Sequence, residues 1–353
     1  MLRLKILFAI SFLFITTSCS QGSSSFSLLS QTNEFIQTGD GLTNKVDILF
    51  VVNDEPSMSS FQDELASSFS TFMQVFQNKG FDFKIAVVTT SGYLADPTLN
   101  GYNVNDIAEA DFNDFDGTQH SGFFVLDTLT PNLFANFTIN SHPVKNSAGQ
   151  DGRAFSSFRQ ALSSDRVSNL NFLRSDSFLA IVLVDNQDDF SGNGRCKGCN
   201  VSGRYTAPTL DPVSVYSDFL DTLTGTSGIS RRYNVSAMTQ IANPCQGGSN
   251  MIRIMELVDN TKGVLGDICQ ADFGNSMVNI SNNIASLSTQ FFLDRIPVES
   301  TIAVYVDGVT VLNDAVNGWT YDSVANSIIF HGAAIPAKGS VVSVDYDPAQ
   351  YGG

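Results

Sequence analysis

The chain has 353 residues, long enough for about two domains of ordinary size. Hydrophobic residues make up 42% of the sequence, so a sizeable core is available, and the formal net charge is −16. Because a surface this acidic repels the phosphate backbone of nucleic acids, we expect no nucleic-acid partner. The same charge is compatible with divalent cations and with solubility outside the cytoplasm.

The first residues have the features of an export signal. Arg3 and Lys5 form a basic start, residues 6–15 are apolar, and small residues precede Cys19. The apolar run is too short to span a bilayer comfortably, which favours a secretory signal over a transmembrane anchor. The ending TTSC resembles that of bacterial lipoprotein signals, in which the cysteine is lipidated. We therefore expect a signal peptide over residues 1–18 and a lipid anchor at Cys19 in the outer membrane, on its periplasmic or surface face.

Residues 19–44 are rich in Ser, Gly, Gln and Thr and carry little charge, which predicts a flexible tether. Beyond it, apolar runs alternate with helical patterns. The predicted strands are 45–52, 83–90, 178–184, 233–240 and 264–269, and the predicted helices are 57–78, 153–162, 213–223, 248–260 and 272–287. Strands that are apolar on both faces and alternate with helices predict an α/β fold with a doubly wound, mostly parallel sheet covered on both sides.

Two regions interrupt this alternation. Residues 92–150 form a long insertion rich in Asn, Asp and Phe, which includes DFNDFDG at 111–117. That stretch resembles a calcium loop with its spacing shifted by one residue; a polar surface loop is the other interpretation. After Pro297 short alternating runs replace the helices, with a hairpin signal at Asp307-Gly308. We therefore expect an α/β domain over 45–294 and a small all-β module over 295–353.

Four cysteines remain besides Cys19. An exported protein meets an oxidising compartment, so disulfides are expected, and four cysteines allow three pairings. Proximity in the sequence favours Cys196–Cys199 and Cys245–Cys269. The motif RCKGC also fits a redox pair or half of a zinc site. Because it lies in a Gly-rich loop without a second CxxC, a structural disulfide is favoured.

Enzyme signatures are missing from the sequence. It contains no GxSxG, HExxH, P-loop or GxGxxG motif, and its three histidines, at 120, 142 and 331, are scattered. A Ser-His-Asp triad requires a histidine beside the nucleophile and a third group that orients it. We therefore expect a protein that is not an enzyme. A hydrolase or redox protein, suggested only by RCKGC and the acidic loops, is the remaining alternative of that class.

Several motifs resemble those of one family, in the same order. DILFVVNDEPSM at 47–58 is similar to DILFVVDxSxSM, the first motif of von Willebrand factor A domains. KIAVVTT at 84–90 is similar to the second strand of that fold. The stretch NFLRSDSFLAIVLVDNQDDFS is similar to FLR…LAVVIVSDEDD of bacterial A-domain lipoproteins, and the tail resembles a β module that these lipoproteins often carry. The resemblance covers about residues 45–350 and implies a von Willebrand A-like fold.

The family binds Mg²⁺ or another divalent ion at a metal-ion-dependent adhesion site, but this chain departs from the pattern. Asn53 stands at the position of the first Asp, Glu55 at that of the first Ser, and Ser57 matches. In the third loop Asn186 stands at the Asp position, with Asp185 one residue early, and NSAGQDGR at 146–153 offers no Thr. In one interpretation, Glu55 supplies the missing charge and holds a relocated Mg²⁺ or Ca²⁺ with Ser57 and Asp185. In the other, which we favour, Asn53 and Asn186 hydrogen-bond the loops together without metal.

The resemblance and the export signal together imply a cell-envelope lipoprotein that acts as an adhesion or protein-binding module. Its partner would be a protein or a glycan at the cell surface or in the periplasm. The candidate binding face consists of the strand-end loops at 53–59, 91–93, 146–153 and 185–195. The alternative is a structural subunit of an envelope assembly, in which the metal site is vestigial and the Phe-rich insertion packs against other copies.

Overall fold

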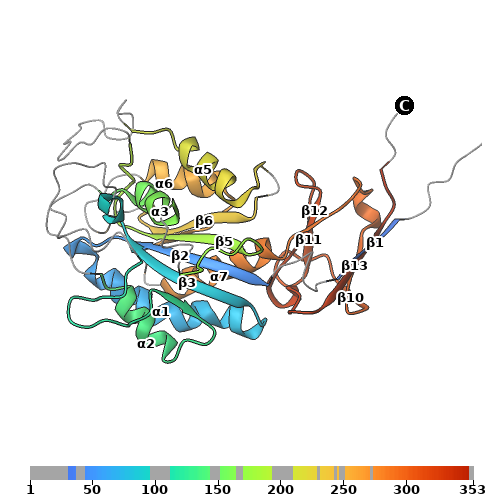
Figure 1. Ribbon diagram of the computed structural model, residues 1–353. Coiled ribbons are helices and arrows are strands. Elements are labelled where there is room, and N and C mark those ends of the chain that lie inside the picture. Colours follow the sequence, from blue (N-terminus) through green and yellow to red (C-terminus); the bar gives the residue numbers. More distant parts are fainter. Residues whose placement is uncertain are drawn as a thin grey trace, which may run out of the picture.

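The computed structural model describes residues 31–36, 44–95, 112–143, 152–163, 170–192, 210–228, 231–241, 245, 251–270 and 273–349. This part of the chain forms a mixed α/β unit at one end and small antiparallel sheets at the other (Figure 1). Cys19, Cys196 and Cys199 lie outside the described residues, so what we expect of them stays a prediction. Across the described residues, no helix combines the length and apolar character that a bilayer crossing requires.

The main sheet has six strands in the described part of the chain, in the order β4-β3-β2-β5-β6-β7. Strand β2 is central, and β4 alone runs antiparallel to its neighbour. The bounds are β2 Lys45–Val52, β3 Asp82–Thr89, β4 Val125–Asp127, β5 Phe178–Val184, β6 Tyr233–Thr239 and β7 Leu265–Asp267. Every residue of β5 and β6 is buried, as expected for parallel strands covered on both faces.

Helices cover both faces of this sheet and divide its core in two. Alternate residues of β2 point to opposite faces: Ile48 and Phe50 join the cluster under α1, α2 and α7, and Leu49 and Val51 join the cluster under α3, α5 and α6. The helices are α1 Ser59–Asn78, α2 Leu133–Asn140, α3 Ala154–Ser163, α5 Ser214–Thr224, α6 Ile252–Asn260 and α7 Phe273–Ser288. The α/β fold with a parallel-rich sheet is thus confirmed.

The helical spacing predicted for 57–78 is also observed. Large apolar side chains of α1 are buried on one face, and Gly80 just beyond the helix has φ +68°, a conformation that glycine adopts without strain. Short 3₁₀ turns at Pro56–Met58 and Gly92–Ala95 follow the ends of β2 and β3. They turn the chain at the carboxyl edge of the sheet, where the candidate binding loops begin.

The C-terminal β module consists of short antiparallel strands that share a core with the α/β unit. Trp319, Ile328 and Val344 belong to the same buried cluster as the α1 and α7 side chains. One described sheet has the order β1-β13-β9-β10, and another has β11-β12-β8. The bounds are β8 Phe291–Phe292, β9 Ala303–Val306, β10 Val309–Val311, β11 Trp319–Asp322, β12 Ser327–Phe330 and β13 Val341–Tyr346, with 3₁₀ turns at Glu299–Thr301 and Gly332–Ala334.

Strand β1, Gln31–Ile36, was not foreseen. It lies inside the range predicted to be a flexible tether and pairs antiparallel with β13, from Gln31 opposite Tyr346 to Ile36 opposite Val341. Strand β8 likewise precedes residue 295 but pairs with β12 of the module. Within the predicted insertion, β4 adds an edge strand to the main sheet and α2 packs beside α1. Strands β1 and β8, which lie outside the range predicted for the β module, therefore pair with strands of that module, and β4 of the insertion joins the main sheet.

Candidate functional site

The loops that leave β2, β3, β5 and β6 converge at one edge of the main sheet. Backbone hydrogen bonds continue the register beyond the strands: the N–H of Asn53 donates to Val184, that of Thr90 to Val52, and that of Asp185 to Met238, at 2.9–3.1 Å. These bonds keep the first residues after β2, β3 and β5 in register with the neighbouring strands. This edge lies at the end of the molecule opposite the β module (Figure 1). It is the position at which open α/β sheets commonly bind ligands.

Asn53 is fully buried at the centre of this edge. Its side-chain oxygen accepts the backbone N–H of Glu55 at 2.7 Å, which is an Asx turn. Its amide nitrogen therefore faces the other way, where it donates to Asp185 Oδ1 at 2.6 Å and lies 3.5 Å from Asn186 Oδ1. The Asx turn assigns the orientation of the amide, which is otherwise ambiguous. Asn53 thus connects the loop after β2, the first loop, to the loop after β5, the third loop, through an N–H donor.

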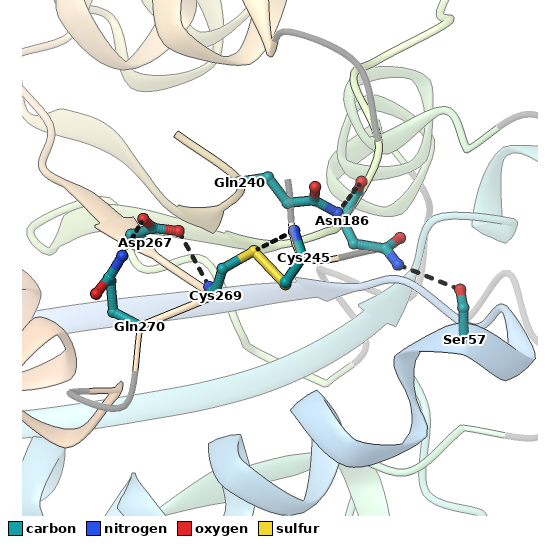
Figure 2. Close-up of a disulfide and its surroundings, with 7 residues drawn as sticks. All are labelled: Ser57, Asn186, Gln240, Cys245, Asp267, Cys269 and Gln270. Atoms are coloured by element: carbon teal, nitrogen blue, oxygen red, sulfur yellow. Dashed lines mark hydrogen bonds between the residues drawn. A yellow bond between two sulfur atoms is a disulfide. The ribbon is translucent and has the colours of Figure 1, made fainter. Parts of the chain in front are cut away.

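Further amide contacts run in parallel with the one from Asn53. Asn186 donates its amide N–H to Ser57 Oγ at 3.2 Å, and its backbone carbonyl accepts from Gln240 at 3.0 Å (Figure 2). Gln187 donates its amide N–H to Glu55 Oε2 at 2.6 Å and its backbone N–H to Asp185 Oδ1 at 2.9 Å. The five residues expected at the site therefore meet. We call the set Asn53, Glu55, Ser57, Asp185, Asn186 and Gln187 the amide network.

Two carboxylates are buried at this edge: Asp54, beside the amide network, and Asp185, within it. Asp54 Oδ1 accepts hydroxyl hydrogen bonds from Thr90 at 3.1 Å and Ser91 at 3.0 Å. Burial raises the pKa of Asp54 to about 6, with these hydrogen bonds opposing the shift. Burial likewise raises the pKa of Asp185 well above its usual value, hydrogen bonds from Asn53 and Gln187 oppose it, and the charge of Glu55 adds to it. The Oδ2 atoms of Asp54 and Asp185 have no hydrogen-bond partner among the described residues.

The residues after Asn186 hold two helices in place, a role that the sequence did not reveal. Asp188 accepts the backbone N–H groups of Arg253 and Ile254, in the first turn of α6, at 3.1 and 3.0 Å. Asp189 accepts the N–H of Phe155, in the first turn of α3, at 2.9 Å and pairs with the Arg253 guanidinium at 3.2 Å. Carboxylates at helix N-termini satisfy otherwise unpaired N–H groups. The third loop is therefore anchored to the scaffold behind it.

The side chains at this edge do not fit the divalent-cation site that the sequence resemblance implied. A hard cation requires oxygen ligands that point inward together. Here the Asn53 position directs N–H at Asp185, and Ser57 Oγ accepts a hydrogen bond from Asn186. Among the described residues, no group of three or more His, Cys, Asp or Glu side chains is arranged to hold a metal ion.

The other predicted features lie away from the amide network. In the insertion, Asp116 Oδ1 accepts hydrogen bonds from Thr118 and Gln119 of its own turn, which is the geometry of a closed polar loop. His142 contacts Asp63 through Nε2 at 3.0 Å, and His331 contacts Thr320 in the β module at 2.7 Å. The described histidines are thus distributed over separate parts of the fold.

The predicted disulfide between Cys245 and Cys269 is confirmed. The two residues have a Cα–Cα distance of 5.5 Å and are separated by 24 positions (Figure 2). The bond connects the segment after β6 to the end of β7, where Asp267 Oδ1 accepts the N–H of Cys269 at 3.0 Å. It therefore cross-links the chain next to the last two strand-end loops.

No protein-family model matches the chain, and no curated protein sequence matches it. Among solved structures, it is similar to the pilus adhesin SpaC from Lactobacillus rhamnosus GG in its open conformation, with 12% identity and a TM-score of 0.40, over 90% of this chain and 42% of SpaC. Proximal thread matrix protein 1 from the mussel byssus shares 9% identity at a TM-score of 0.40, over 73% of this chain and 51% of that one.

The adhesive tip pilin GBS104 from Group B Streptococcus agalactiae shares 9% identity at a TM-score of 0.33, over 90% of this chain and 80% of the pilin. Bacterial pilus adhesins are thus among the structural neighbours of this chain. The chain spans about half of the length of the first two of these proteins or less. Likeness at this level does not transfer a function.

Proposed function

We propose that this protein is a binding module of the bacterial cell envelope. In this proposal a von Willebrand A-like domain over about 45–294 binds a partner protein or glycan through its strand-end loops, and a β module over about 295–353, completed by β1, supports it. The observation that carries the proposal is the convergence of Asn53, Ser57 and Asn186 at the carboxyl edge of the sheet, where the family motifs predicted that they would meet.

The loops have the properties of a binding surface on a rigid scaffold. Pro56 and Ser57 are exposed at the rim, and Asn53 and Asp185 below them are fully buried. The amide network and the carboxylate caps hold residues 53–57 and 185–189 of these loops in place before a partner arrives. A surface that is already ordered loses less conformational entropy on binding. Adhesion through this edge therefore requires little rearrangement.

The position of β1 is consistent with presentation at an outer surface. Strand β1 belongs to the β module, at the end of the molecule away from the strand-end loops (Figure 1). A lipid anchor at Cys19, shortly before β1 in the sequence, would attach at that end. The proposed binding edge would then be directed away from the outer membrane, toward a partner.

The test compares two substitutions that each remove one carboxylate. Glu55→Ala lies in the proposed binding loops, and Glu299→Ala lies on the exposed surface of the β module at the other end of the molecule. Partners captured from cell-envelope extracts by the full chain would be identified by mass spectrometry. We expect Glu55→Ala to lose partners that Glu299→Ala retains. Retention of every partner by both variants would remove the strand-end loops as the binding face.

A structural subunit of an envelope assembly is the second candidate. It is favoured by large apolar side chains exposed on the β module: Val309, Leu312, Val316 and Val324 are 68–74% exposed. Exposed apolar side chains mark protein contacts where they gather into one patch. Light scattering distinguishes the candidates, because an assembly subunit would associate as its concentration rises, whereas a purely adhesive module would stay at constant mass.

A further inference from the structure

Building on the proposed function, we propose that amide side chains replace a divalent cation in holding the strand-end loops of this chain, with Asn53 as the central group. The binding face would then be formed without metal and would be insensitive to chelators.

The orientation of Asn53 is the first support. Its oxygen is occupied by the N–H of Glu55, so its NH₂ group is the part that faces Asp185 Oδ1 at 2.6 Å and Asn186 Oδ1 at 3.5 Å. An amide nitrogen carries two donors and offers no lone pair to a metal. Asp185 Oδ1 and Asn186 Oδ1, which could otherwise face a cation, face this N–H donor instead. Asn53 therefore joins the first loop to the third loop directly, as a cation bound by both loops would.

The remaining members of the network pair donors with acceptors in the same way. Asn186 directs its amide N–H to Ser57 Oγ, so this hydroxyl is already engaged as an acceptor. Glu55, at the position of the family's first Ser, accepts the amide N–H of Gln187. Each of these bonds joins the first loop to the third. A cation between the loops would have to share these oxygens with N–H donors that already occupy part of their acceptor capacity.

The charges of the two amide positions also balance the missing cation. Relative to the family pattern, Asn53 and Asn186 each remove one negative charge, and the absence of a divalent cation removes two positive charges. At these two positions the changes cancel, and the carboxylates that Glu55 and Asp185 add elsewhere in the network accept N–H donors from Gln187 and Asn53. Asn53 is fully buried and Asn186 is 5% exposed, so an unbalanced change would be costly at either site. The two amides are thus matched substitutes for two carboxylates and one cation.

The test restores the carboxylates. Asn53→Asp combined with Asn186→Asp replaces both amides by acids, and the control, Asn260→Asp combined with Asn317→Asp, adds the same charge at exposed positions. Isothermal titration of the full chain with MgCl₂ and MnCl₂ would be accompanied by thermal unfolding with and without EDTA. We expect the wild type and the control to bind neither ion and to unfold identically in EDTA. The restored variant is expected to bind a single Mn²⁺ and to unfold at a higher temperature when the ion is present.

Binding of Mg²⁺ or Mn²⁺ by the wild type, with a midpoint lowered by EDTA, would overturn the proposal. So would a restored variant that is folded by circular dichroism and still binds neither ion. If the restored variant does not fold, the wild-type titration and the single variant Asn186→Asp decide the question by the same criteria. Retention of all partners by Glu55→Ala would instead defeat the proposed function and leave these cation results unaffected.

Discussion

Asp54 gives a prediction whose size follows from the structure. The carboxyl is 1% exposed, and burial raises its pKa from the usual 3.8 to about 6. Because the folded state holds this proton more tightly than the unfolded state, the free energy of unfolding falls as the pH rises from about 4 to about 6. At about 1.4 kcal/mol per pKa unit, the penalty for ionised Asp54 at neutral pH is about 3 kcal/mol.

The substitution Asp54→Asn removes this penalty, because an amide does not ionise and its oxygen can still accept from Thr90 and Ser91. The new amide nitrogen replaces Oδ2, which has no partner among the described residues, and a buried unpaired donor costs about 1 kcal/mol. We therefore expect Asp54→Asn to stabilise the protein by about 2 kcal/mol at pH 7.5 and to give no gain at pH 4.

Urea unfolding at the two pH values measures this difference, with Asp347→Asn, at an exposed position of the β module, as the charge-matched control. The control is expected to change stability equally at both pH values. An Asp54→Asn variant that is no more stable than the wild type at pH 7.5, or that gains as much at pH 4, would refute the assignment of a penalised buried charge to Asp54.

Three further predictions concern the scaffold. Replacing Cys269 by Ser opens the disulfide with Cys245 and should lower stability by about 3 kcal/mol, measurable by thermal unfolding; reduction of the wild type should have the same effect, and no effect of either would contradict it. Arg174→Ala leaves the fully buried Asp47, which Arg174 contacts at 2.7 Å, without its counter-charge and should cost about 3–5 kcal/mol in urea unfolding, whereas Arg231→Ala, at a more exposed pair, should cost less. Deleting residues before Asn44 removes β1 and should accelerate amide exchange in β13 but not in β6, and unchanged exchange in β13 would show that β1 does not pair there.

The main sheet was predictable because its signal is local. Strands such as FLAIVLV at 178–184 are continuous apolar runs, and α1 repeats large apolar residues every three or four positions. Burial of a strand on both faces leaves a continuous apolar run in the sequence, and burial of a helix on one face leaves a periodicity. The positions of these elements were therefore predicted to within a few residues.

Strand β1 was missed because its signal is not local. The segment QTNEFI lies among Ser, Gly and Gln residues, and its partner β13 is about three hundred residues later in the chain. Its six residues are mostly polar, so neither an apolar run nor a regular alternation marks them as a strand. The composition of residues 19–44 indicated a tether for the same reason.

The candidate site was predictable in its members but not in its bonding. Alignment of the family motifs identified Asn53, Ser57 and Asn186, and these side chains meet. The sequence could not show which way the Asn53 amide turns, because the Asx bond that orients it forms only in the folded loop. The caps that Asp188 and Asp189 provide to α6 and α3 were also hidden, since the helices they serve are remote in the sequence.

Anomalous diffraction from crystals of the wild-type chain soaked in MnCl₂ tests the central claim most directly. The account predicts no manganese peak between Asn53, Ser57 and Asn186, and electron density that keeps the Asn53 side chain within hydrogen-bonding distance of Asp185. A manganese peak bonded to Ser57, Asp185 or Glu55 would contradict it, and would show that the loops are held by a cation after all.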